Sequence, residues 1–307
     1  MTSVFSILFG VAAPLILGYA VPVQGQPWQQ RIAKALNWNI IALMFSMGML
    51  FGVDKDIHEN LVKIGLVGVL AFVILTVCNG LGLLLVTRHR SVQSFKNTER
   101  PVFASLRQRL WSALQEITVL GYLIAGFFIG QLGFLSIEDI HNLSWGVLIV
   151  LLVMIGLDLR VHGIHLGKAM LNKAGFIMAM AVFVSSLVAA VLIHFVSDLS
   201  LAESVAVTSG YGWYSLTGVL VTQKAGAYIG GLAFTLDICR ELLVILSLPV
   251  LSRVHSAVGV GYCGATAVDV TLPFLKKAYG IEIVPLALSS GLILSVITPV
   301  LIMAVLG

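Results

Sequence analysis

Three ionisable residues stand close together in a strongly apolar stretch of the chain, residues 235–242 (TLDICREL). On a helix, spacings of three and four positions place Asp237, Arg240 and Glu241 close to one face. A charge inside a membrane span costs roughly 2.5–3.5 kcal/mol on insertion scales, so each such group needs a reason. Arg240 can neutralise one carboxylate, and the other can then bind a cation or exchange a proton. The competing interpretation is a structural Arg–carboxylate pair at a helix end that faces lipid headgroups.

Three further acids stand at the ends or breaks of apolar runs. Asp54 closes an apolar run, and its position alone favours a hydrated loop acid. Asp158 stands two residues before Arg160, which favours a local ion pair at the membrane interface. Asp269 lies near Thr266 in a glycine-interrupted segment, where both a helix cap and a contact with substrate or ion fit.

A run of small and aromatic residues interrupts another apolar segment, and we expect it to bind substrate together with Thr266. Its members are Ser209, Gly210, Tyr211, Gly212, Trp213, Tyr214 and Ser215. Unwound backbone here would offer amides to a carboxylate, and the aromatic rings could flank an ammonium group. Small residues also suit a close-packed helix interface, which is the simpler alternative.

The sequence gives little sign of an enzyme. It contains no Gly-x-Ser-x-Gly elbow and no Walker Gly-Lys-Ser/Thr loop. His162 and His165 are spaced like metal ligands but lack nearby carboxylate or cysteine partners. We therefore expect no catalytic residues, no cofactor and no metal, and a transport activity driven by an ion gradient.

The composition requires lipid as the surroundings of these residues. Hydrophobic residues make up 59% of the 307 positions and charged residues 10%, whereas soluble domains carry about 25% charged residues. The chain repeatedly offers apolar runs close to the roughly 20 residues that cross a bilayer as a helix. The net charge of +4 does not indicate nucleic acid, because most basic residues lie in short loops beside these runs.

These runs predict an all-α polytopic membrane protein. Six are clear: Val4–Val21, Trp38–Val53, Ile64–Val86, Ile117–Phe134, Trp145–Leu157 and Phe176–Val196. An external N-terminus places the basic clusters in cytoplasmic loops, in agreement with the positive-inside rule. We therefore expect a multi-pass protein of a bacterial cytoplasmic (inner) membrane, with both termini outside.

A weak internal repeat divides the chain into two units. Met47-Gly48 corresponds to Ile155-Gly156, and Lys63 to Lys173, each near the same place in a set of three spans. Three crossings reverse the next unit, so the repeats are inverted, as in many secondary transporters. We expect a six-helix scaffold over residues 1–200 and a transport unit over residues 201–307, with two broken hairpins and two helices.

Two topologies fit the broken segments. If each is a re-entrant hairpin, the chain has about eight spans and two hairpins. If each is a full crossing, the chain has ten spans. Arg253 lies inside in the first topology and outside in the second, and its position beside His255 favours the first.

Three motifs together resemble the bacterial lysine exporter family called LysO. They are residues 209–218 (SGYGWYSLTG), Asp237-x-x-Arg240-Glu241-Leu242, and residues 263–273 (CGATAVDVTLP). The resemblance covers essentially the whole chain and is most specific from about residue 200 onward. It implies export of L-lysine and of its analogue thialysine, with the family's functional intramembrane carboxylates falling on Asp54 and Glu241.

The hypothesis for function is therefore a lysine/proton antiporter. Asp54, Glu241, Asp237, Arg240 and Asp269 are its expected coupling residues. Its partners are L-lysine, protons and the bilayer, and a homodimer is an option that the sequence leaves open. Two rivals remain: a monovalent cation/proton antiporter and an organic-anion transporter.

Overall fold

A computed structural model describes residues 13–87, 106–161, 172–251, 255–268 and 270–307 of the chain. Helices dominate these residues, and none of them is in a strand. Beside a short helix over residues 13–20, the elements are α2 (Gln26–Val53), α3 (Lys55–Val86), α4 (Leu106–Gln131), α5 (Ile137–Val161), α7 (Lys173–Val196), α8 (Leu201–Thr208), α9 (Tyr214–Leu251), α10 (Ser256–Cys263), η1 (Gly264–Val268), α11 (Leu272–Tyr279), η2 (Ile281–Ile283) and α12 (Val284–Leu306). The all-α class predicted from the sequence is confirmed for the described residues.

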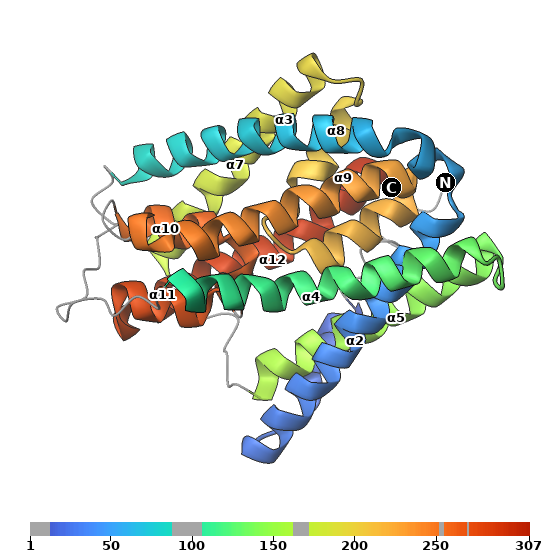
Figure 1. Ribbon diagram of the computed structural model, residues 1–307. Helices are drawn as coiled ribbons and strands as arrows, with labels where there is room; N and C mark the ends of the chain where they lie inside the picture. The colour runs from blue at the N-terminus through green and yellow to red at the C-terminus, as the bar shows by residue number, and fades with distance from the viewer. Residues whose placement is uncertain (1–12, 88–105, 162–171, 252–254, 269) are drawn as a thin grey trace.

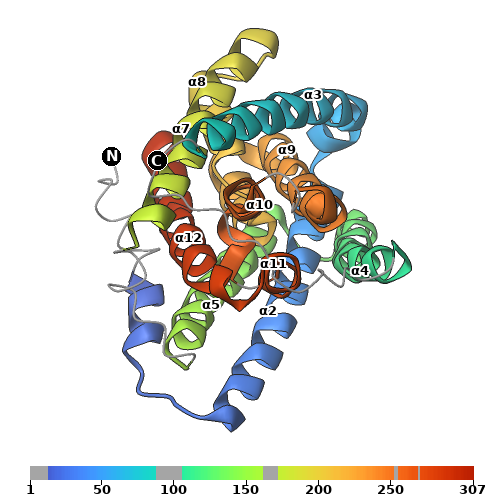
Figure 2. The ribbon, with the colours of Figure 1, turned by 90° about the vertical axis from the view of Figure 1, so that its left-hand side faces the viewer.

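The C-terminal helices form the centre of the molecule. Helices α9, α10 and α12 lie between α3 and α7 on one side and α2, α4 and α5 on the other (Figures 1 and 2). Helix α2 packs against both α4 and α5, and α3 against both α7 and α9. The N-terminal part of the chain therefore surrounds the segments that carry the motifs.

Five described helices are long and apolar enough to cross a membrane: Gln26–Val53, Lys63–Val86, Ile137–Val161, Lys173–Val196 and Val284–Leu306. Apolar side chains on their outer faces are exposed, among them Leu66, Val69 and Phe195. Such exposure would be unfavourable in water but is expected against lipid. The fold is that of a multi-pass membrane protein.

Local sequence signals explain where several helices begin. Pro27 occupies the first turn of α2, where its missing N–H costs no hydrogen bond. The Asn172 side chain accepts a hydrogen bond from the N–H of Gly175 at the start of α7. Helix α8 begins with a capping box, in which Ser200 and Glu203 each accept a hydrogen bond from the other's backbone N–H.

An ion pair joins the loop before α8 to the first residue of the membrane-length part of α3, Lys63–Val86. Lys63 forms an ion pair with Asp198, with Nζ 2.8 Å from Oδ2. Deeper in the bundle, α3 meets α7 through Asn79, whose side-chain oxygen accepts hydrogen bonds from Ser185 and Ser186. Small hydroxyl residues allow helices to approach closely and bond across the interface.

Candidate functional site

Two broken segments meet tip to tip at the centre of the protein. The first is α8, residues 209–213 and the start of α9; the second is α10, η1 and α11. We call residues 209–213 the first tip and residues 263–266 the second tip. The N–H of Ala265 donates a hydrogen bond to the carbonyl of Tyr211, at 2.9 Å. This bond joins positions more than fifty residues apart in the chain.

Backbone conformation explains why the helices break at these points. Tyr211 has a φ of 52° and Gly212 a φ of 93°, and both values lie in the left-handed region that helices avoid. Gly264 has a φ of 65°, and a Cβ atom there would overlap the Tyr211 carbonyl group. Only glycine combines this conformation with so close an approach.

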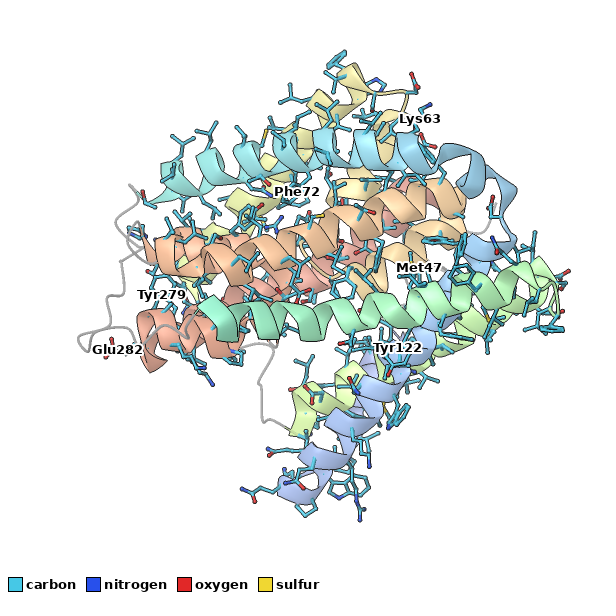
Figure 3. All side chains as sticks on the ribbon, in the orientation of Figure 1. Met47, Lys63, Phe72, Tyr122, Tyr279 and Glu282 are labelled. Atoms are coloured by element: carbon cyan, nitrogen blue, oxygen red, sulfur yellow. The ribbon has the colours of Figure 1, made fainter. Side chains whose placement is uncertain are left out.

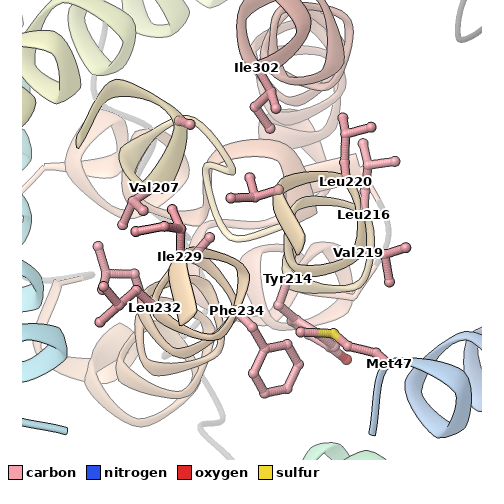
Figure 4. Packing of buried hydrophobic residues seen from close by; sticks show 14 of the residues in the cluster. Met47, Val207, Tyr214, Leu216, Val219, Leu220, Ile229, Leu232, Phe234 and Ile302 are labelled. Carbon is pink, nitrogen blue, oxygen red and sulfur yellow. The ribbon is translucent and has the colours of Figure 1, made fainter. Parts of the chain in front are cut away.

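Helix α9 is two antiparallel helices joined at Gly226, whose φ is 85°. A Cβ added to Gly230 would meet Thr222, and one added to Gly218 would meet Phe234. The two halves therefore run side by side, and Tyr214 of one half stacks edge-on against Phe234 of the other at 5.7 Å. Figure 4 shows these two rings beside Met47 of α2.

The second half of α9 carries Asp237, which binds the first tip. Asp237 is 1% exposed, and its Oδ1 accepts a hydrogen bond from the N–H of Gly212 at 2.8 Å. A Cβ at position 210 would overlap this carboxylate, so glycine there makes room for it. Asp237 is thus the acceptor for an amide that the broken helix leaves without a backbone partner.

Arg240, one turn further along α9, binds the second broken segment. Its Nε donates to the carbonyl of Tyr262 at 3.0 Å and its Nη2 to that of Gly261 at 3.4 Å. The guanidinium also lies 4.9 Å from the centre of the Tyr262 ring. The Tyr262 hydroxyl in turn bonds Thr76 of α3 at 2.6 Å. A cation at the carboxyl end of α10 is favoured by the helix dipole.

The two acids that the family resemblance implies differ in burial and in position along the helices. Glu241 is 2% exposed on α9, whereas Asp54 is half-buried and ends α2. Phe51, three residues before Asp54, packs beside Gly231. Gly231 is ten residues before Glu241, or on the order of 15 Å along a helix. The two carboxylates therefore occupy separate places.

A cavity of about 180 Å³ lies next to the tips. Its walls come from residues 13–20, α2, α5, α12 and both tips, and most of its lining side chains are apolar. The polar lining comes from Ser215 and Thr266 beside the tips, Ser295 on α12 and Asp158 on α5. Trp213 is the aromatic residue of the first motif that faces this space.

The structure separates the predicted site residues into two groups. Trp213, Ser215 and Thr266 line the cavity, whereas Tyr211, Asp237, Arg240 and Glu241 are buried among the helices. The hydroxyl of Ser209 bonds the carbonyl of Val205, and that of Thr266 bonds the Cys263 carbonyl at 2.9 Å. Asp269 lies outside the described residues.

Asp158 lines the cavity, although we did not include it among the expected site residues. Its pairing with Arg160 stays a prediction; the structure adds that Arg160 lies over the ring of Tyr19 at 5.7 Å. Leu151, Ile155 and Asp158 are spaced by four and three positions, so they share one helix face. The position of an acid within that apolar stripe was the sequence signal that could have identified Asp158 as a cavity residue.

No group of three His, Cys, Asp or Glu side chains within the described ranges could hold a metal ion. The polar chemistry near the tips comes instead from amides, hydroxyls and the charged residues of α9.

Membrane-length helices around two broken segments with buried charges define a multi-pass membrane transporter. A family model described as "Lysine exporter LysO" matches residues 120–306. The lysine exporter LysO of Escherichia coli (strain K12) is 34% identical over 298 residues, which cover 97% of this chain and 98% of that protein. A Haemophilus influenzae protein named "Putative lysine exporter" is 36% identical over 156 residues, covering 51% of this chain and 80% of its own length. No solved structure matches. The chain belongs to the LysO family of lysine exporters, which are transporters and not enzymes.

Proposed function

We propose that this protein exports L-lysine across the cytoplasmic membrane of a bacterium. The observation that carries the proposal is the meeting of two broken segments beside Asp237, Arg240 and Glu241, next to a cavity. Interrupted helices at mid-membrane are where secondary transporters bind their substrates. Membership of the family supplies the substrate, because both relatives carry a lysine exporter name.

The proposed topology has eight spans and two re-entrant hairpins that enter from opposite faces. The first hairpin is α8, the first tip and the part of α9 up to Gly226. Lys63 of α3 binds Asp198 just before this hairpin, and Ile64 of α3 packs beside Gly231 just after it. Both ends of the hairpin are therefore near the start of the membrane-length part of α3, which supports this topology. A ten-span topology would require the turn at Gly226 at the opposite face.

The second hairpin belongs to the other end of α3. A Cβ at Gly261 would meet Leu83, and one at Gly259 would meet Tyr279, so α10 and α11 run back along each other. Tyr279 and Glu282 lie at the opposite end of the molecule from Lys63 (Figure 3). The basic residues of α11 and the acids of α5 fit an internal and an external face, respectively.

We also propose the division into a scaffold of residues 1–200, built from two inverted three-helix repeats, and a transport unit of residues 201–307. Gly18 packs against the backbone of Val153 and Leu157, and Gly126 against that of Phe45 and Met49. The paired positions differ by the same 108 residues (18 to 126, 45 to 153, 49 to 157). Such reciprocal packing is what a repeated unit produces.

The proposed mechanism is lysine/proton antiport, in which protonation of Glu241 or Asp54 from outside displaces the lysine cation. Glu241 supports this role because it is almost fully buried in the transport unit, where a carboxylate is stable only with a partner or a proton. Thialysine, which has the same charges as lysine, would follow the same route.

The test is lysine-driven proton movement in proteoliposomes, with wild type, Glu241→Gln and Glu282→Gln compared. Glu282 is exposed in η2, so it controls for the loss of an acid. We expect coupled flux in wild type and Glu282→Gln and none in Glu241→Gln. Lysine flux without proton movement would refute antiport. Proton flux that depends on Na⁺ or K⁺ and ignores lysine would identify a cation antiporter instead.

A further inference from the structure

Among the described residues that line the cavity beside the tips, one is an acid. Neither the family motifs nor the buried cluster of α9 includes it. Asp158 lies near the end of α5 and is half-buried. The start of α2 runs beside this end, because the Gln29 side chain donates to the carbonyl of Val161 at 3.4 Å. In the proposed topology this end faces the cytoplasm, from which an exporter takes its substrate.

The cavity wall at the start of α9 has the reverse polarity. Ser215 is the second residue of α9, is 5% exposed and lines the cavity. The first amides of a helix carry a partial positive charge and favour anions. A buried hydroxyl and a helix start together provide a site for a carboxylate.

Most of the other side chains that line the cavity are apolar. Leu151, Ile155 and Asp158 lie along one face of α5 and all line the cavity, opposite Leu36 and Ile40 of α2. Asp158 is seven positions after Leu151, or about 10 Å along the helix. Lysine carries its side-chain ammonium group on a flexible four-carbon stem, so a cavity lined by an acid, apolar side chains and a helix start matches its chemistry.

We propose that Asp158 binds the side-chain ammonium of the exported amino acid, with its stem against the apolar walls and its carboxylate at the start of α9 beside Ser215. This assignment rests on the proposed function and deepens it: the cavity selects a long aliphatic ammonium. Asp158 then holds the substrate that protonation of Glu241 or Asp54 displaces.

The test is calorimetric binding of lysine to the full-length protein in detergent. Norleucine is the comparison ligand, because it keeps the aliphatic stem and lacks the side-chain ammonium. Asp158→Asn is compared with Asp158→Glu, which keeps the charge. Glu138→Gln is the matched control, since Glu138 is an exposed acid in the first turn of the same helix. We expect Asp158→Asn to raise the lysine Kd about tenfold or more, the size of a charged hydrogen bond. The norleucine constant should stay as in wild type.

Asp158→Glu should recover much of the lysine affinity, and Glu138→Gln should bind as wild type does. Unchanged lysine affinity in Asp158→Asn would overturn the assignment, and so would an equal loss for lysine and norleucine, which indicates general damage to the fold. A wild-type protein that binds and exports no lysine would instead overturn the proposed function itself.

Discussion

The contact between Asp237 and the first tip gives the sharpest prediction. The N–H of Gly212 is buried and donates to the Asp237 carboxylate at 2.8 Å. Asp237→Ala leaves this amide without that acceptor. A buried polar group deprived of its partner costs about 1–3 kcal/mol, so a mid-range value of about 2 kcal/mol corresponds to a factor of about 30 in the local opening equilibrium.

Hydrogen exchange of the Gly212 amide is the appropriate assay because it reports local opening. Thermal stability is a poorer readout, since Asp237→Ala also removes the cost of burying a carboxylate and the two effects oppose each other. We expect exchange at Gly212 to be about 30-fold faster, with the interior amides of α12 unchanged. Asp237→Asn keeps an oxygen acceptor, so its effect should be less than about tenfold.

Unchanged exchange at Gly212 in Asp237→Ala would show that the carboxylate does not hold the first tip. Faster exchange throughout the protein would show a general loss of stability and would equally refute a local role.

Three further predictions concern the second tip, Arg240 and the loop before α8. Gly264→Ala should lower the Tm and the transport rate more than Gly133→Ala. The two glycines have similar φ values, 65° and 69°, but only a Cβ at position 264 would meet the backbone of Tyr211. Equal losses in the two variants would contradict the contact between the tips. Arg240→Met should lower the free energy of unfolding by about 2 kcal/mol in chemical unfolding, because two carbonyls lose a charged donor. Arg240→Lys should keep only part of the wild-type stability, since a lysine replaces neither the paired donors nor the ring contact. Full wild-type stability in Arg240→Lys would refute this explanation. The hydrogen bond from Lys63 holds the pKa of Asp198 below its ordinary value, so the pair stabilises the fold above about pH 4 and is lost as pH falls further. The Tm difference between wild type and Asp198→Asn should therefore shrink on acidification, and a growing difference would contradict the sign.

The amino-acid sequence was sufficient for the features that depend on local chemistry. Apolar runs determine that the chain forms membrane-length helices, because a backbone in lipid must bond within its own segment. Glycine-rich interruptions at residues 209–215 and 259–264 predicted the breaks, since consecutive small residues permit left-handed φ values. The charged run at 235–242 marked the part of α9 that contacts both broken segments.

The tertiary structure decided which partners these residues have. Helical spacing placed Arg240 close to Asp237 and Glu241. The tertiary structure adds that Arg240 donates to carbonyls of α10 and that Asp237 accepts from the first tip. Likewise, Asp158 lines a cavity because α5, α2 and the tips converge there. Spacing along one helix fixes only which residues share a face, whereas the contact made by that face depends on segments far away in the chain. The reversal at Gly226 and the meeting of the two tips bring those segments together, and no local pattern specifies either.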